Sequence, residues 1–317
     1  MESRIKVSIL VPIYNVEKYI GKCLDSILTQ TYTNVDYVFV DDCSTDNSLQ
    51  VLKSKLSEHS IPPGNYTIVC HSENKGIAQT RIDLLTGAKG DYVQFIDSDD
   101  WIEKDMVEKM VEATGNGKVD IVGCDFIWEY EDGKSMANYE HFADTCHENM
   151  IKTINFQITP VLWKLLINKA LFSHFKIARH INVGEDYIIS IKLFYYASSF
   201  THLHKHLYHY VQVNASRLSS QIRRGIKDHI MAVKEVEDFF TKQRMLSDEI
   251  NEQLILRKFN IRSNFLNNRF LDYEEYDKCF PESKGAWRKI NYSRRERIKF
   301  WLADHKLYSL LRLIQGN

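Results

Sequence analysis

The chain has 317 residues, of which 44% are hydrophobic and 26% charged, with only 13 glycines and 5 prolines. These proportions are typical of a globular protein with a sizeable core, and they exclude collagen-like, linker-rich and disordered classes. The net charge of −1 is unevenly spread. Residues 1–150 hold 13 basic and 26 acidic side chains (−13), and residues 151–317 hold 28 and 16 (+12), so the two halves are expected to have different partners.

The chain carries no signal for a membrane span, for secretion or for disulfide bonds. No apolar run approaches the roughly 18 residues that cross a bilayer, and the apolar run 7–11 is too short for a signal peptide. The six cysteines are scattered without a Cys-x-x-Cys pair, which argues against a disulfide framework or a zinc site. We therefore expect a cytoplasmic protein with buried, reduced thiols.

Short apolar strands alternate with amphipathic helices in the first third of the chain. The spacing predicts strands at 7–11, 37–40, 66–70 and 92–96, and helices at 19–28, 49–56, 77–86 and 106–111. Gly87 is expected to cap the third of these helices. Such alternation predicts an α/β fold with a doubly wound, largely parallel sheet.

The later part of the chain is mixed and then helical. The pattern predicts strands at 121–128 and 201–213 and a helix from Glu185 to Phe194. Two further helices are expected at 235–270 and 294–314, separated by a break at 281–285. We therefore predict an α/β domain at 1–215 and a helical region at 216–317.

Three polar clusters follow predicted strands, namely Pro12–Asn15, Asp41–Asp42 and Asp97–Asp99. Ligands of doubly wound sheets bind outside the carboxyl ends of the strands, so the three clusters should share one edge. The carboxylates of Asp97 and Asp99 can together bind Mg²⁺ or Mn²⁺, which prefer oxygen ligands and often bridge to substrate phosphates. The alternative for Asp97–Asp99 is a solvated turn that caps the next helix.

The run from Val7 to Asp46 has a strand ending in Pro-x-Tyr-Asn, then Ser-x-x-x-Gln-Thr, then a strand ending in Asp-Asp-x-Ser-x-Asp. Two further motifs follow, Glu73–Gly76 with Arg81 and the segment YVQFIDSDD at 92–100. In this order the motifs resemble those of glycosyltransferase family 2, and the resemblance covers about residues 5–200. The resemblance implies a GT-A fold, with a nucleotide-sugar half at about 1–128 and an acceptor half at about 129–215, and transfer with inversion.

The resemblance also implies roles for individual residues. It places the nucleotide-sugar donor on Pro12, Tyr14, Asn15, Asp42, Asn74, Gly76, Arg81, Asp97 and Ser98. Tyr14 would stack near the base, and Asp42 would accept a hydrogen bond from a uracil-type ring. Asp99 would be the main ligand of the Mn²⁺ or Mg²⁺ ion, with Asp97 beside it. In isolation, Tyr14 also fits a core edge and Arg81 a surface ion pair.

Asp186 is the candidate general base. The resemblance matches Glu185–Asp186 to an acidic pair whose Asp takes the proton from the acceptor hydroxyl, a step that one carboxylate can perform. Asp186 is expected in the first turn of a helix, where the helix dipole would lower its pKa. The alternative is a pair of ordinary helix-start carboxylates. Glu185 and Lys164 are candidates for contact with the diphosphate or acceptor, although Lys164 equally fits a snorkelling lysine.

Two other groups of residues are candidates for a functional role. His202, His204 and His206 are expected on one face of a strand, with His209 on the other; they fit a transition-metal site, a polar strand face or the border of the acceptor site. Residues 284–299 hold seven basic side chains and one acid, with Trp287, Phe300 and Trp301 nearby. Such a helix fits peripheral contact with an anionic membrane, a packed terminal helix or a homodimer contact.

The chain also departs from the family pattern. Cys43 stands where the family often has glycine, Ile82 where it often has asparagine, and the Trp-Asn-Lys-Leu segment lacks its asparagine at Trp163–Leu165. The segment QIRRG at 221–225 lacks the tryptophan of the Gln-x-x-Arg-Trp motif. Together with the missing membrane spans, this argues against a processive polymer synthase.

We therefore predict a metal-dependent glycosyltransferase. It would move a single sugar from a nucleoside-diphosphate sugar, most simply a UDP-sugar, to a glycan or lipid-linked glycan. A nucleotidyltransferase would need a Gly-rich phosphate loop after the first strand, and a dehydrogenase would need Gly-x-Gly-x-x-Gly; both are missing there. A glycan-binding or scaffolding protein that kept the fold is the non-enzymatic alternative. No nucleic-acid partner is expected.

Overall fold

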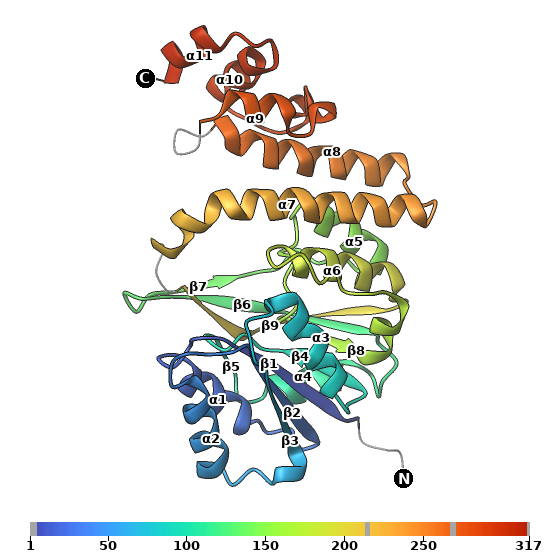
Figure 1. Ribbon diagram of the computed structural model, residues 1–317. Coiled ribbons are helices and arrows are strands. Elements are labelled where there is room, and N and C mark those ends of the chain that lie inside the picture. Colours follow the sequence, from blue (N-terminus) through green and yellow to red (C-terminus); the bar gives the residue numbers. More distant parts are fainter. Residues whose placement is uncertain (1–4, 213–215, 267–270, 316–317) are drawn as a thin grey trace.

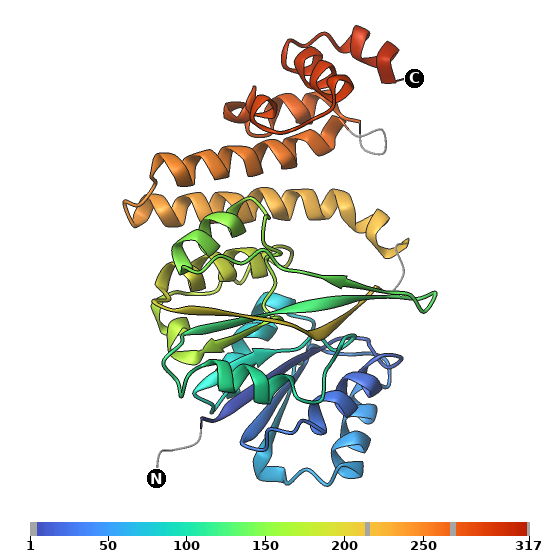
Figure 2. The same cartoon turned by 180° about the vertical axis from the view of Figure 1, so that it is seen from behind.

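The structure, a computed structural model, describes residues 5–212, 216–266 and 271–315, without the side chains of 216–224 and 314–315. Within these residues one nine-stranded sheet has the order β3-β2-β1-β4-β8-β6-β9-β5, with β7 paired to β6 (Figures 1 and 2). The strands are β1 (Val7–Ile13), β2 (Val35–Asp41), β3 (Tyr66–Cys70), β4 (Tyr92–Phe95), β5 (Trp101–Ile102), β6 (Ile121–Tyr130), β7 (Ser135–Asn138), β8 (Leu165–Asn168) and β9 (Phe200–Gln212).

Helices cover both faces of this sheet. Their bounds are α1 (Ile20–Leu28), α2 (Ser48–Glu58), α3 (Ile77–Gly87), α4 (Met106–Ala113), α5 (Cys146–Ile154), α6 (Glu185–Tyr196), α7 (Ser216–Lys242), α8 (Asp248–Ser263), α9 (Tyr273–Lys278), α10 (Arg294–Asp304) and α11 (Tyr308–Gln315). Alternate side chains of a strand point to opposite faces, so Ile9 and Val11 pack with α1, α2 and α4. Leu10, between them, packs with α3, α5 and α6.

The expected α/β class is confirmed, but the sheet is parallel only in part. Strands β3, β2, β1 and β4 are parallel, as are β6 and β9. Strand β8 is antiparallel to both of its neighbours, and β5 and β7 are antiparallel as well. These three strands were not expected, because they are two to four residues long and too short for a period to be recognised.

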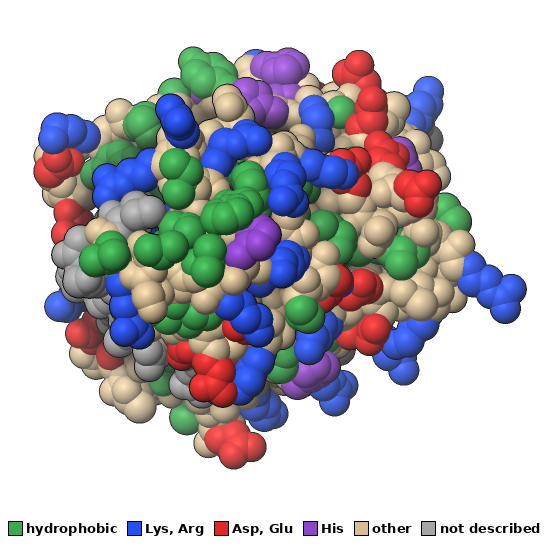
Figure 3. Space-filling view, turned by 90° about the horizontal axis from the view of Figure 1, so that it is seen from above, with side chains coloured by type: hydrophobic (Ala, Val, Ile, Leu, Met, Phe, Trp, Pro, Cys, Tyr) green, Lys and Arg blue, Asp and Glu red, His purple; other side chains and the backbone are tan. Residues whose placement is uncertain are grey.

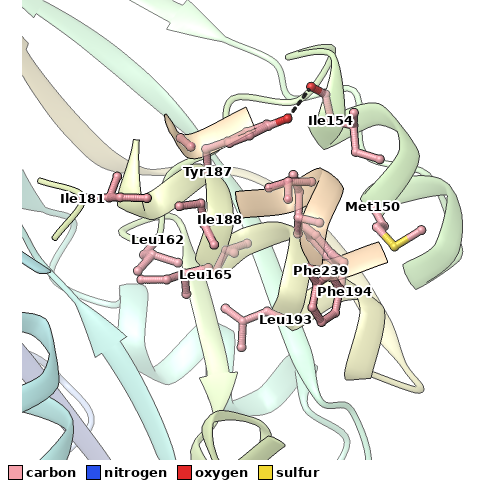
Figure 4. Packing of buried hydrophobic residues seen from close by; sticks show 14 of the residues in the cluster. Met150, Ile154, Leu162, Leu165, Ile181, Tyr187, Ile188, Leu193, Phe194 and Phe239 are labelled. Carbon is pink, nitrogen blue, oxygen red and sulfur yellow. Dashed lines mark hydrogen bonds between the residues drawn. The ribbon is translucent and has the colours of Figure 1, made fainter. Parts of the chain in front are cut away.

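Helix α6 is buried over most of its surface, and its first residues lie at the sheet edge. Tyr187 and Phe194 lie in the buried cluster with Phe239 of α7 (Figure 4). The Tyr187 hydroxyl donates to the Ile154 carbonyl at 3.1 Å, which ties α6 to α5. Gly184 precedes α6 with φ at +89°, a left-handed conformation in which glycine avoids the cost of a Cβ atom.

The C-terminal region contains more and shorter helices than expected. The single helix expected at 235–270 is wrong: α7 begins at Ser216, and the chain turns back into α8 (Figure 1). Arg244 has φ at +56°, and the Ser247 hydroxyl caps α8 by accepting from the Ile250 amide. The helix expected at 294–314 is likewise divided into α10 and α11, around Lys306 with φ at +59°. The break at 281–285 is confirmed.

One smaller expectation, the Gly87 cap, needs correction. Gly87 is the last residue of α3 and not a left-handed cap; a Cβ atom there would lie 2.8 Å from Val38 Cγ1, so glycine permits close packing on β2. The domain boundary near 215 stays a prediction. Strand β9 ends at Gln212 and α7 follows, but Val233 and Val236 of α7 share a buried cluster with α6.

Candidate active site

A cavity of about 850 Å³ lies at the carboxyl ends of β1, β2 and β4 and against the starts of α3 and α6. Its size falls within the range of small-molecule sites. Among the residues singled out from the sequence, its walls include Pro12, Tyr14, Asp42, Asn74, Gly76, Arg81, Asp97, Ser98, Asp99, Glu185 and Asp186. The three polar clusters therefore share one sheet edge, as parallel strands require.

The cavity walls include an exposed aromatic ring and a turn that is held by hydrogen bonds. Tyr14 is 49% exposed, so its ring is accessible. Asp42 is buried and accepts from the Lys75 amide at 2.8 Å and the Gly76 amide at 2.9 Å, and it pairs with His71 Nδ1 at 2.6 Å. Asp42 thus uses two of its roughly four acceptor positions to hold the turn at 74–76 and a third to contact His71.

The loop after β4 divides its carboxylates between the cavity and the interior. Asp97 and Asp99 line the cavity and offer oxygen atoms, which suit a hard divalent cation. Asp100 is buried and accepts from the Tyr208 hydroxyl at 2.6 Å and the Val211 amide at 2.7 Å, both on β9. The Tyr208 oxygen also accepts from the Asp97 amide at 3.2 Å, so Tyr208 holds the loop at two points.

Arg81 is a buried cation that joins three cavity carboxylates. Its guanidinium lies 2.8 Å from Asp186 Oδ1, 3.3 Å from Glu185 Oε1 and 3.9 Å from Asp97 Oδ1. Burial nevertheless raises the pKa of Asp186 well above its usual value, against the lowering effect of Arg81. The expectation of a lowered pKa at this helix start is therefore wrong, because desolvation is the largest effect on the Asp186 carboxyl.

The sequence also matches a known protein family. The family model described as glycosyl transferase family 2 matches residues 8–181, more than half of the chain. The chain belongs to glycosyltransferase family 2. It is accordingly a glycosyltransferase, and the sheet with its flanking helices is a GT-A fold.

Bacterial glycosyltransferases are similar in sequence to this chain, two of them over most of its length and another over about a third. "Glycosyltransferase GlyG" of Streptococcus pneumoniae is 30% identical over 86% of this chain and 94% of its own length. "Putative glycosyltransferase EpsH" of Bacillus subtilis is 29% identical over 78% of this chain and 72% of its own. "Poly(ribitol-phosphate) beta-glucosyltransferase" of Bacillus spizizenii is 35% identical, but over only 37% of this chain and 18% of its own.

Solved structures share the fold of this glycosyltransferase at low sequence identity. S. aureus TarS 1–349 in complex with UDP-GlcNAc has a TM-score of 0.64 at 19% identity, covering 98% of this chain and 91% of its own. The mannosyltransferase PcManGT from Pyrobaculum calidifontis, in complex with GDP-Man and Mn²⁺, has a TM-score of 0.56 at 17% identity, covering 99% and 83%. In the described part of the glycosyltransferase, no helix is both long and apolar enough to span a membrane.

Two candidate residues of the glycosyltransferase lie outside the cavity walls. Lys164 is 1% exposed and pairs with Glu140 at 2.9 Å, so its ammonium group does not face the cavity. Burial lowers the pKa of Lys164 to about 8. Asn15 has φ at +53°, and its side-chain oxygen accepts from the Thr45 amide at 2.8 Å, so it supports the loop.

Several cavity residues were not found from the sequence. They are Ile77, Thr80, His180, Asn182, Val183, Gly225 and Asp228. Asn182 accepts from the Ala78 amide at 3.2 Å and occupies the space that a Cβ atom on Gly76 would need. Residues 180–183 lie in a loop that contains no recognisable motif. Asp228 lies on α7, and a single acidic residue on a helix does not indicate a binding site. The side chains of residues 221–224, which belong to the QIRRG segment, are not among those that the structure describes.

The histidines and cysteines also differ from expectation. His209 is buried and pairs with Glu103 at 2.9 Å and Glu129 at 2.7 Å. None of the four strand histidines lines this cavity, whereas His204 and His206 line a separate pocket of about 620 Å³, and their place at the acceptor site stays a prediction. All six cysteines are free, but Cys70 is exposed and Cys43 half-buried, contrary to the expectation of uniformly buried thiols.

Cys43 occupies a backbone position that favours glycine. Its φ is +65°, and a non-glycine residue in the left-handed region costs about 1–2 kcal/mol. Cys43→Gly should therefore raise the free energy of unfolding by roughly 1 kcal/mol or leave it unchanged, offset in part by the flexibility glycine adds to the unfolded chain. Urea denaturation measures this, with Cys43→Ala as the matched control that keeps the Cβ atom. A loss of stability in Cys43→Gly, with Cys43→Ala unchanged, contradicts it.

Proposed function

We propose that this glycosyltransferase transfers a single hexosyl or N-acetylhexosaminyl group from a nucleoside-diphosphate sugar, most simply a UDP-sugar, to a hydroxyl of a glycan or lipid-linked glycan. The reaction is metal-dependent, inverts the anomeric centre and serves cell-surface polysaccharide synthesis. The observation that carries the proposal is one cavity that holds Tyr14, Asp97, Asp99 and Asp186 together.

The side chains of the cavity walls support the proposed binding of a nucleotide-sugar donor. A nucleotide base needs a flat face, and the half-exposed Tyr14 ring offers one. Asp97 and Asp99 would hold Mn²⁺ or Mg²⁺, since both carboxylates line the cavity and both ions prefer oxygen. When bound, such an ion neutralises the charge that develops on the leaving diphosphate.

Asp186 acts as the general base in this proposal. The acceptor oxygen forms its bond to the anomeric carbon while the bond from that carbon to the diphosphate breaks, and the hydroxyl proton passes to an Asp186 oxygen. Arg81 holds this carboxylate at 2.8 Å and so restricts its orientation. The raised pKa of Asp186, caused by burial, makes it a stronger proton acceptor than an exposed carboxylate.

Known relatives support the donor and acceptor classes. UDP-GlcNAc is bound by TarS, and GDP-Man with Mn²⁺ by PcManGT, whose folds this chain shares. The name of the poly(ribitol-phosphate) beta-glucosyltransferase states that its acceptor is a polymer. A segment of that protein is similar to part of this chain. These likenesses support a nucleotide-sugar donor, a divalent ion and a polymeric acceptor.

Thermal unfolding with and without ligands tests the donor site. UDP with Mn²⁺ should raise the melting temperature, because a ligand present at 100 times its Kd stabilises the native state by about 2.7 kcal/mol. Asp99→Ala should abolish the shift, and Asp132→Ala, which removes an exposed carboxylate on the β6–β7 hairpin, should keep it. If no nucleoside diphosphate shifts the wild type with any divalent metal, the donor site is refuted and a glycan-binding scaffold becomes the better description.

A peripheral contact with an anionic membrane, at the cytoplasmic face, is part of the same proposal. Exposed apolar side chains lie on α10, α11 and the turn between them, namely Ile298, Trp301, Leu307, Leu310 and Leu313. Seen from the side of the C-terminal helices, apolar patches alternate with many Lys and Arg side chains (Figure 3). Trp287 and Phe300 are buried in the terminal helical cluster, so only Trp301 of the three aromatic residues faces outward. Basic and apolar groups together suit a membrane that carries negative charge.

Vesicle sedimentation tests this contact. The protein should bind vesicles of phosphatidylglycerol and phosphatidylcholine, and the double variant Arg294→Glu with Arg297→Glu should bind at least about tenfold more weakly. The matched control reverses two exposed lysines of the α/β domain, Lys18→Glu with Lys53→Glu, and should bind as the wild type. Equal loss in both double variants would show general charge attraction only. A concentration-dependent dimer without vesicle binding would assign the surface to a second copy of the chain instead.

A further inference from the structure

The pairing of β6 with β9 is interrupted in the middle of both strands. Cys124 pairs with Leu203, Asp125 with His206 and Phe126 with Tyr208, so the register shifts on each side of Asp125. The extra residues of β9 are accommodated as bulges, where ladder hydrogen bonds are lost. The ladder is therefore locally disrupted beside Asp125, although the two strands stay paired on both sides of it.

Three metal-ligating side chains converge at this interruption. Asp125 is 1% exposed, and its Oδ1 lies 2.9 Å from His202 Nε2. The His204 ring lies 3.9 Å from the His202 ring, centre to centre. One ligand atom from each of these three residues lies within 4.8 Å of the other two.

We propose that Asp125, His202 and His204 bind a divalent transition-metal ion, for which zinc is the best match. Two imidazoles and one carboxylate are a ligand set typical of zinc, whereas Mg²⁺ and Mn²⁺ prefer oxygen ligands throughout. Ligands of a tetrahedral zinc ion at about 2.0–2.1 Å lie roughly 3.3 Å apart, so small side-chain movements suffice here. His204 is exposed, which leaves room for water at the fourth position.

The surroundings of the three residues fit this assignment. The Glu140 amide donates to Asp125 Oδ1 at 2.8 Å, the kind of outer hydrogen bond that orients metal ligands. The buried Lys164 lies nearby, but its charge is balanced by the Glu140 carboxylate at 2.9 Å. A hydrogen bond between Asp125 and His202 alone would not require His204, which nevertheless lies against His202.

The proposed ion differs from the one proposed for the donor. None of its three ligands lines the cavity, and His206, expected with them from the sequence, packs edge-on against Tyr139 at 4.6 Å instead. The ion would join β6 to β9 across the bulges. Strand β9 also carries Tyr208, which holds the Asp97–Asp100 loop, so this second ion would stabilise the strand that supports the donor site.

Binding of Co²⁺ and Zn²⁺ to the full-length, metal-free protein tests the proposal. Co²⁺ should give the visible absorption of a four-coordinate ion at about one equivalent, and Zn²⁺ should displace it. His204→Ala should weaken binding about tenfold or more, and because His204 is exposed, this variant should keep its fold, as circular dichroism can check. His206→Ala is the matched control on the same strand and should bind as the wild type.

Two further variants separate this site from other ligands. Asp99→Ala should leave Co²⁺ binding intact, since it alters only the cavity, and Cys70→Ser should also leave it intact although it removes an exposed thiol. Binding that survives His204→Ala, or that is lost in Asp99→Ala or Cys70→Ser, would overturn the proposal. So would a wild type that binds neither ion at micromolar concentration. Failure of the UDP shift described above would leave this result unaffected, because the two sites share no residue.

Discussion

Replacing Asp186 with asparagine is expected to lower kcat by about 10²–10⁴-fold while UDP binding is retained. Asparagine keeps the shape of the side chain but cannot accept the proton of the acceptor hydroxyl. The backbone amide of Leu162, 3.4 Å from Asp186 Oδ2, still has an oxygen partner in the variant, so the start of α6 should keep its position. The measurement is kcat for sugar transfer, or for donor hydrolysis where no acceptor is known, together with the thermal shift by UDP and Mn²⁺.

Two variants in the same cavity are the controls for Asp186→Asn. Asp228→Asn removes a carboxylate that also lines the cavity but comes from α7, and it should change kcat far less. Glu185→Gln removes the neighbouring carboxylate, which contacts Arg81 at 3.3 Å, and should have an intermediate effect. If Asp228→Asn causes the larger loss and Asp186→Asn stays within about tenfold of the wild type, Asp228 is the base and the role of Asp186 is structural.

The sequence predicted the donor half of the fold well because its signals are local. Each of β1, β2 and β4 is a short apolar run that leads into polar residues. A helix is the next element after β1 and β2, and after β4 the helix α4 follows the two-residue strand β5. Parallel strands necessarily bring such ends to one edge, so the convergence of Tyr14, Asp42 and Asp97 did not depend on knowing any side-chain position.

The remainder of the site depends on contacts between distant segments. Asn182 meets Gly76 across more than 100 residues of sequence, and Asp228 reaches the cavity only because α7 folds back over α6. The pKa of Asp186 was predicted in the wrong direction for the same reason. Its position at a helix start is visible in the sequence, but its burial beside Glu185 and Asp97 is not, and burial is the larger effect.

Arg81 makes contacts of this kind, because it pairs with carboxylates from distant segments of the chain. We expect Arg81→Met to lower the free energy of unfolding by about 3–5 kcal/mol, because removing one partner from a buried ion cluster leaves the opposite charges uncompensated. Asp97 lies 88 residues before Glu185 and Asp186 follows directly, and the Arg81 guanidinium joins the three carboxylates. Urea denaturation measures the loss, and Arg81→Lys should recover only part of it, since an ammonium group cannot form the same planar contacts.

Arg262→Met is the matched control, because Arg262 is equally buried and pairs with Asp304 at 3.2 Å within the terminal helical cluster. Both variants should be destabilised, but only Arg81→Met should weaken the binding of UDP with Mn²⁺ to the folded fraction. In Arg81→Lys, kcat should fall more than KM rises, since the lysine keeps the charge near Asp97 but no longer fixes the Asp186 carboxylate. If Arg81→Met unfolds at the urea concentration of the wild type, the three carboxylates are held by their own backbone segments. The proposed orientation of the base would then depend on the start of α6 and not on Arg81.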